Sequence, residues 1–196
     1  KESNQRDGIN KLRHTMKYSG MDKTICASIV GSGWKAGVGA SIGSSPYEMA
    51  DADLIILWGT NAVSTQVNVM HHITKARKNR GAKLIVIDPY KNQSALVADK
   101  HICINPGTDG ALALSMMNIL LRENLVDRKF LNNNTDYSEK LEILISDKNS
   151  KWGEQITGIP AEEIEILALE YGKTDRAFIR LGYGFSRHRN GAAAVH

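Results

Sequence analysis

The sequence has 196 residues, of which 42% are hydrophobic and 23% are charged, which allows one globular domain with a buried core. Its formal net charge is +4, but the basic residues are scattered and only 6% of the residues are aromatic. This pattern excludes the long basic stripe of a nucleic-acid-binding groove. Two cysteines are too few for a disulfide scaffold, and the sequence contains no Cys-x-x-Cys pair of the kind that binds zinc or an iron–sulfur cluster. No apolar run is long enough to insert directly into a membrane.

The sequence begins without Met, and its last residues after Gly191 read like the opening of another helix, so we expect an excerpt of a larger protein. Residues 1–21 are polar with weak helical spacing, which predicts a lead-in segment that is helical or partly ordered. Residues 22–196 are expected to form one α/β domain.

Glycines are dense at the start of that domain. Five of them lie between residues 31 and 45, too many for a stable isolated helix, so we expect a close-packed loop or a broken helix there. Ser45 followed by Pro46 is typical of a helix start, with serine as the N-cap and proline in the first turn.

Two apolar runs then read as buried strands. The first, residues 54–58, ends in Gly59-Thr60-Asn61, and a helix capped by Ser64 or Thr65 should run to Asn79 before Gly81 closes it. The second strand, residues 83–87, ends in Asp88-Pro89. Two strand ends joined by a helix form the kind of crevice in which α/β proteins bind nucleotides.

The second half continues the alternation of strands and helices. A short helix is expected within residues 94–99, a brief strand at 102–104, a mostly apolar and buried helix from Asp109, and a fourth strand at 177–181. The remaining expectations are a short helix from Asp127 with a loop at 132–134, a weak helix or strand at 140–145, a turn at 155–160, and a helix from Pro160 that Gly172 ends. This order predicts an α/β fold with a doubly wound, mainly parallel sheet and helices on both faces, which is Rossmann-like.

The candidate binding residues lie at strand ends or at a helix start. Glycine there lets backbone N–H groups approach a phosphate, Asp88 could accept hydrogen bonds from ribose hydroxyls, and Asp109 could bind the N–H pair of guanine or serve as an N-cap. Each residue alone also fits ordinary turn chemistry, but their common position favours a ligand site. No Gly-x-Gly-x-x-Gly follows the first strand, which counts against a dinucleotide site for NAD(P) or FAD. The set comprises Gly59, Asn61, Asp88, Gly107, Asp109, Gly182 and Gly184.

Candidates for catalysis are fewer. No serine lies in a nucleophile elbow, His71 and His72 lie in the middle of a predicted helix, and Asp51 and Asp53 are better explained as solvated residues than as a metal pair. Cys26 is a soft metal ligand placed in a predicted loop before the glycine-rich segment.

Several motifs in a fixed order resemble the molybdopterin oxidoreductases of the dimethyl sulfoxide reductase family. The resemblance runs from about residue 22 to residue 196. It rests on residues 53–61, 76–89, 98–99, 106–112, 127–130, 156–162, 182–184 and 187–191.

The resemblance implies a bis(molybdopterin guanine dinucleotide) cofactor with molybdenum or tungsten, and a 4Fe-4S cluster only in an N-terminal part outside this sequence. The chain would be one α/β cofactor-binding domain, with Cys26 as metal ligand and catalytic residue. It would hold one guanine dinucleotide half, with Gly182 and Gly184 near the pterin. The resemblance assigns the other half-site positions to Gly59, Asn61, Asp88, Pro89, Asp99, Gly107 and Asp109.

This sequence departs from the family pattern at three places. Ala27 and His196 stand where formate dehydrogenases have His and Arg, which counts against formate oxidation. Tyr90 follows Asp88-Pro89 where an arginine is usual, and Lys91 could substitute for that cation.

The expected activity is oxygen-atom or two-electron transfer on a small substrate that the sequence does not identify. Expected partners are the other domains of the same enzyme and electron-transfer subunits, without nucleic acid. Two alternatives are a nucleotide-binding module for NAD or a guanine nucleotide without metal, and a non-catalytic scaffold subunit of the same family. The sequence does not fix the cellular location, although the cytoplasm is favoured.

Overall fold

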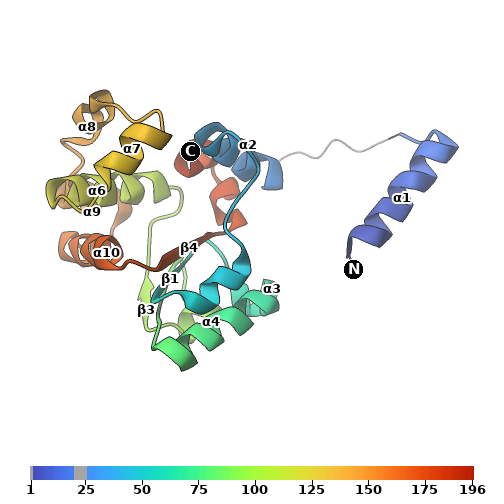
Figure 1. The fold of residues 1–196 in the computed structure, drawn as a ribbon, viewed down its shortest axis with the longest axis horizontal. Coiled ribbons are helices and arrows are strands. Elements are labelled where there is room, and N and C mark those ends of the chain that lie inside the picture. Colours follow the sequence, from blue (N-terminus) through green and yellow to red (C-terminus); the bar gives the residue numbers. More distant parts are fainter. Residues whose placement is uncertain (1, 20–25) are drawn as a thin grey trace.

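The computed structural model describes residues 2–19 and 26–196. The boundary predicted between residues 21 and 22 therefore lies outside the described residues. Helix α1 (Glu2–Met16) occupies the lead-in segment, and Figure 1 shows it apart from the sheet and its helices.

The other elements alternate as the sequence predicts, and the α/β fold is confirmed. The strands are β1 (Leu54–Trp58), β2 (Lys83–Ile87), β3 (Lys100–Ile102) and β4 (Ala177–Leu181). The first half carries the helices α2 (Cys26–Val38), η1 (Pro46–Asp51), α3 (Ala62–Thr65), α4 (Val67–Arg80) and α5 (Gln93–Leu96). The second half carries α6 (Asp109–Arg122), α7 (Arg128–Asn134), α8 (Glu139–Ile145), α9 (Ser150–Thr157), α10 (Ala161–Lys173), η2 (Tyr183–Arg187) and α11 (Gly191–Val195).

The four strands form one parallel sheet in the order β3-β2-β1-β4. Strand β1 is central, and its Trp58 pairs with Ile87 on one side and Leu181 on the other. From β1 the chain continues to β2 and β3 on one side of β1, and it then returns to form β4 on the other side of β1. The connections therefore run in opposite directions on the two sides of the gap between β1 and β4. This arrangement is the topological switch point at which open α/β sheets bind ligands.

Helices cover both faces of the sheet, as Figure 1 shows for α4 on one side and for α6, α9 and α10 on the other. Alternate residues of β1 enter two separate cores: Ile56 packs with residues of α6 and α10, and Leu57 packs with residues of η1 and α4. This two-sided burial explains why β1 reads as a continuous apolar run rather than an alternating one.

The prediction of a loop or broken helix in the glycine-rich segment was wrong for residues 31–38, which lie in α2. The reason is tertiary packing against α11. A Cβ on Gly33 would lie 2.2 Å from the carbonyl oxygen of Ala192, and one on Gly37 would lie 2.9 Å from that of His196. These glycines let two helices touch backbone to backbone, which offsets their low helix propensity.

Several predicted boundaries also need correction. Strand β3 lies two residues earlier than expected, and α7 includes the predicted loop at 132–134. The segment 140–145, predicted as a helix or a strand, is part of helix α8, and the predicted turn at 155–160 lies partly in α9. Gly172 lies inside α10 rather than at its end, because it does not adopt the positive φ of a helix-ending glycine; its lack of a side chain leaves room for Leu120.

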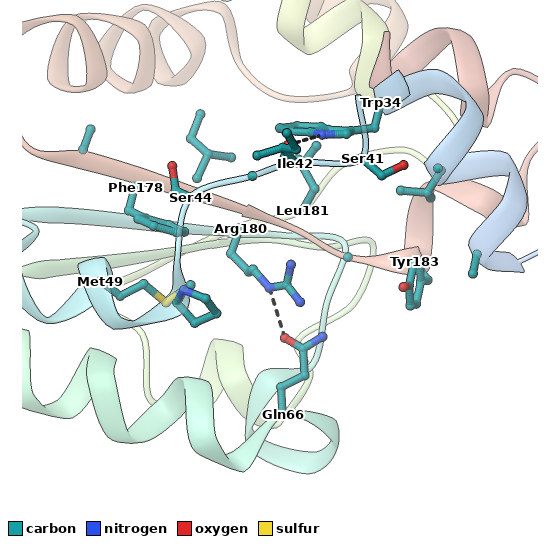
Figure 2. Close-up of a pocket in the computed structure, with 18 residues that line it drawn as sticks. Trp34, Ser41, Ile42, Ser44, Met49, Gln66, Phe178, Arg180, Leu181 and Tyr183 are labelled. Atoms are coloured by element: carbon teal, nitrogen blue, oxygen red, sulfur yellow. Dashed lines mark hydrogen bonds between the residues drawn. The ribbon is translucent and has the colours of Figure 1, made fainter. Parts of the chain in front are cut away.

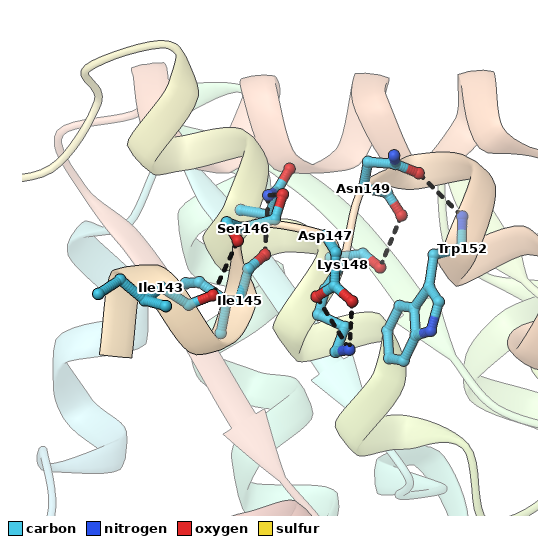
Figure 3. Close-up of polar contacts among 9 residues, drawn as sticks. Ile143, Ile145, Ser146, Asp147, Lys148, Asn149 and Trp152 are labelled. Carbon is cyan, nitrogen blue, oxygen red and sulfur yellow. Dashed lines mark hydrogen bonds and ion pairs between the residues drawn. The ribbon is translucent and has the colours of Figure 1, made fainter. Parts of the chain in front are cut away.

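The link between α8 and α9 is fixed by backbone-directed hydrogen bonds (Figure 3). The side chain of Asn118 on α6 donates to the carbonyl groups of Ile145 and Ser146, and Asn149 caps α9 by accepting from the backbone N–H of Trp152. The two Asn118 bonds attach the end of α8 to α6, and the Asn149 cap fixes the start of α9. Across residues 2–19 and 26–196, no helix combines the length and apolar character needed to cross a membrane.

Candidate functional site

The turns after β1 and β4 meet at the carboxyl edge of the sheet. The backbone N–H of Gly182 donates to the carbonyl of Trp58 at 2.8 Å, and that of Gly184 donates to the carbonyl of Gly59 at 3.0 Å. A Cβ on Gly182 would lie 2.2 Å from the Gly59 oxygen, so a larger residue would separate the turns. The structure therefore brings these three predicted glycines together at the switch point.

Asn61 connects the first turn to the segment after β2. Its side-chain oxygen accepts hydrogen bonds from the backbone N–H of Ser94 at 3.3 Å and from the Ser94 hydroxyl at 3.0 Å. The same hydroxyl oxygen accepts from the backbone N–H of Val63 at 3.0 Å. These bonds fix the spacing between the ends of β1 and β2.

Asp88 is buried at the end of β2. Its two carboxylate oxygens accept from the backbone N–H of Tyr90 at 3.2 Å and from the side-chain amide of Asn92 at 2.9 Å. Burial raises the pKa of the Asp88 carboxyl above its ordinary value, and these two hydrogen bonds oppose that shift. The acid is thus held in one orientation by neutral donors.

The turn before α6 places Asp109 beside β1. The indole Nε1 of Trp58 donates to one oxygen of the Asp109 carboxylate at 2.8 Å. Asp109 is the first residue of α6 rather than its N-cap, which is Thr108. Gly107 has a positive φ of 80°, and its carbonyl accepts from the side chain of Asn190 at 2.9 Å. The turn is therefore tied both to β1 and to the segment before α11.

Cys26 is the first described residue of α2, so its predicted location in a loop was wrong. Its sulfur is half-buried and lies 3.5 Å from the Ser186 hydroxyl oxygen in η2. That hydroxyl also donates to the carbonyl of Tyr183 at 2.7 Å. Because η2 follows the Gly182 turn directly, Ser186 links the sulfur to the carboxyl edge.

Of Pro89 and Asp99, only Pro89 lies at the carboxyl edge of the sheet. Pro89 is exposed directly after Asp88, and its carbonyl lies 3.2 Å from the sulfur of Cys103. Asp99 lies at the start of β2: it accepts from the backbone N–H of Leu84 at 2.7 Å and forms an ion pair with Arg77. The structure thus separates Asp99 from the other predicted cofactor residues.

Within the described part of the chain, no three His, Cys, Asp or Glu side chains are grouped so that they could hold a metal ion. The matching family model is described as molybdopterin oxidoreductase and covers residues 9–196.

The chain belongs to the molybdopterin oxidoreductase family. It is 44% identical over 93% of its length to the probable oxidoreductase YoaE of Bacillus subtilis, and 33% identical over 94% to the dimethyl sulfoxide reductase DmsA of Escherichia coli. It is also 33% identical over 93% to the F420-dependent formate dehydrogenase subunit alpha of Methanocaldococcus jannaschii.

Among solved structures, acetylene hydratase from Pelobacter acetylenicus matches 87% of this molybdopterin oxidoreductase chain with a TM-score of 0.76 and 26% identity. The chain spans only 27%, 25% and 28% of the three curated relatives, and 23% of the solved one. The curated relatives include a dimethyl sulfoxide reductase and a formate dehydrogenase subunit, and the family implies a molybdopterin cofactor with molybdenum or tungsten.

Sequence reasoning missed four residues that hold the candidate site of this molybdopterin oxidoreductase domain. Trp58 could have been suspected, because a polar ring nitrogen at the end of a buried strand needs a partner. The others become visible only when segments distant in sequence are brought together. They are Asn92, Ser94 and Ser186.

Proposed function

We propose that this domain holds one guanine dinucleotide half of a bis(molybdopterin guanine dinucleotide) cofactor in a larger enzyme. That enzyme would catalyse oxygen-atom or two-electron transfer on a small substrate. The observation that carries the proposal is the convergence of Gly59, Asp88 and Asp109 on one sheet edge at the switch point.

The residues at this edge fit a guanine dinucleotide in their chemistry. Gly59 and Gly107 both have positive φ, a backbone conformation that residues with a side chain rarely adopt. Two carboxylates supply acceptors for the N–H and hydroxyl donors of guanine and ribose. Neither Asp88 nor Asp109 forms an ion pair with any described cation, so neither acid is neutralised by a paired cation.

Asp109 is the residue we assign to guanine. Trp58 holds one carboxylate oxygen, and the second oxygen accepts no hydrogen bond from a described residue. Because Trp58 already fixes this carboxylate, the Asp109 side chain would lose little conformational freedom when a ligand binds, which favours binding. Trp58 would be its positioning residue.

Asp88 is the residue we assign to ribose. Each of its oxygens already accepts one hydrogen bond from the protein, and each retains capacity for a second. Asn92 and the Tyr90 N–H would therefore orient the carboxylate toward hydroxyl donors rather than compete with them.

Cys26 is the residue we assign to the metal, because a thiolate is a soft ligand suited to molybdenum or tungsten. When bound, the cofactor metal would supply two-electron chemistry, and the protein would supply the ligand and its orientation. The Ser186 hydroxyl oxygen lies 3.5 Å from the sulfur and would pack beside the thiolate, since its proton is donated to the carbonyl of Tyr183.

Other parts of the same enzyme would supply the second cofactor half, a 4Fe-4S cluster and contacts to electron-transfer subunits. The isolated domain should have little or no activity, because half of the cofactor site would be missing. The relatives are about four times as long, which supports this division.

The test is X-ray absorption at the metal edge of the complete enzyme that carries this chain, with guanine nucleotide measured after denaturation. Cys26→Ser should remove one sulfur from the metal coordination while the guanine content stays at the wild-type level. Cys103→Ser is the matched control, because Cys103 is exposed near Pro89 and should leave the spectrum unchanged. An unchanged sulfur count in Cys26→Ser would refute the ligand assignment, and absence of both metal and guanine from the wild type would refute the proposed function.

A further inference from the structure

A cavity of about 470 Å³ runs along the outer side of β4 (Figure 2). Its walls come from β4, from α2 and from the segment 41–46, which leads into η1. Among the predicted cofactor-binding residues only Gly182 lines it, so the cavity is separate from the carboxylates at the sheet edge. Its size falls within the range of small-molecule sites, about 300–1,000 Å³.

Among the described residues that line the cavity, Arg180 alone is charged. It shares a sheet face with Phe178, two residues earlier, and the structure places it half-buried beside the start of α4. Its Nε donates to the side-chain oxygen of Gln66 at 3.3 Å, as Figure 2 shows. No carboxylate of the described residues lies within ion-pair distance, and the two terminal nitrogens make no hydrogen bond to a described residue.

A half-buried guanidinium without an ion-pair partner among the described residues favours binding of an anion. Its terminal nitrogens present four N–H donors in a planar fork that matches a carboxylate. Partial burial removes water from the guanidinium, which costs solvation free energy that no described acid offsets. A ligand anion would offset that cost. Gln66 holds the fork from behind and so reduces the freedom lost on binding.

The remaining walls are largely apolar. Trp34, Met49 and Leu181 lie around the cavity, and the Trp34 indole N–H donates to the carbonyl of Ile42 at 2.7 Å. That bond fastens the segment 41–46 to α2, so the wall opposite β4 is held in place. Ser41 and Ser44 add hydroxyl groups.

We propose that this cavity binds a small organic monoanion, namely a carboxylate on an apolar body of about the size of benzoate. The carboxylate lies on the Arg180 fork and the apolar body lies against Phe178, on the same face of β4. Ala27, next to Cys26, also lines the cavity, so the cavity reaches the start of α2. The proposal does not depend on Cys26 binding a metal.

The test titrates benzoate and its neutral counterpart, benzyl alcohol, into the complete enzyme by calorimetry. Benzoate should bind at least about tenfold more tightly than benzyl alcohol, because a charge-assisted hydrogen bond distinguishes them. Arg180→Gln should weaken benzoate binding by about tenfold or more and leave benzyl alcohol unchanged. Lys75→Gln removes the same charge from an exposed site on α4 outside the cavity and should change neither affinity.

Ser44→Phe is the second variant, because Ser44 is exposed and its replacement should fill the cavity without disturbing the core. It should weaken both ligands. Guanine nucleotide content should be at the wild-type level in all three variants, which separates this cavity from the proposed dinucleotide site. Absence of benzoate binding by the wild type, equal binding by Arg180→Gln, or loss of guanine nucleotide in Arg180→Gln would each overturn the proposal.

Discussion

The two edges of the sheet use their carboxylates differently. At the amino edge, before the strands begin, Asp53 pairs with Arg80 and Arg176, and Asp99 pairs with Arg77. At the carboxyl edge, Asp88 and Asp109 accept hydrogen bonds from neutral groups, namely a backbone N–H, an amide and an indole.

This difference separates stabilising acids from acids available to a ligand. A carboxylate paired with arginine has its charge and its acceptors occupied by the protein. A carboxylate held by neutral donors keeps its orientation and its charge for another partner. The family match implies a molybdopterin cofactor, and we propose that the carboxyl edge of this domain receives it.

The largest expected effect comes from the glycine contact at the carboxyl edge. Gly182→Ala would place a Cβ 2.2 Å from the Gly59 carbonyl oxygen and should lower the free energy of unfolding by roughly 2–3 kcal/mol. Thermal or denaturant unfolding of the chain would measure it.

Gly31→Ala is the control for that substitution. A Cβ on Gly31 would meet nothing within 4 Å, and Gly31 lies inside α2. This variant should be unchanged or more stable by up to about 1 kcal/mol, because alanine favours helix. Equal destabilisation by both variants would show that glycine at the switch point has no special packing role.

A moderate effect is expected from Trp58→Phe. The ring keeps most of its apolar contacts, but Asp109 loses the indole N–H donor 2.8 Å away. The free energy of unfolding should fall by about 1–2 kcal/mol. The double variant Trp58→Phe with Asp109→Asn should cost less than the sum of the two single variants, and strict additivity would argue against an energetic link.

The smallest effects concern pH, and the two edges should respond with opposite signs. Hydrogen bonds from Arg176 and then Arg80 hold the pKa of Asp53 below its ordinary value of 3.8, so its contribution to stability is lost as pH falls through the folded pKa. Burial holds the pKa of Asp88 above 3.8, so protonation favours the folded state as pH falls from the folded pKa toward 3.8.

Unfolding free energies of the wild type, Asp53→Asn and Asp88→Asn between about pH 6 and pH 3 would test this. Relative to Asp53→Asn the wild type should lose stability in acid, and relative to Asp88→Asn it should gain stability. Slopes of the same sign would remove the electrostatic distinction between the edges.

The sequence was sufficient for the features that depend on local pattern. Strands β2 and β4 have the predicted bounds, because each is a short apolar run between turn residues. Gly81 closes α4 in a left-handed conformation, as a glycine after a helix usually does.

The features that depend on distant partners were not predictable. The glycines of α2 are explained by close packing against the backbone of α11, which is more than 150 residues away in the sequence. Asp99 was assigned through the motif at residues 98–99, but it directly precedes β3 and therefore lies at the opposite edge. The positions of Asn92 and Ser186 likewise depend on how the chain returns to the sheet.

The most direct test compares one acid from each edge in the complete enzyme. Guanine nucleotide would be measured per folded molecule in Asp109→Asn and Asp99→Asn, with thermal unfolding used to confirm that both variants are folded. We predict that Asp109→Asn loses most of its guanine nucleotide while Asp99→Asn retains the wild-type amount. Full retention in Asp109→Asn together with loss in Asp99→Asn would contradict the assignment of the cofactor to the carboxyl edge.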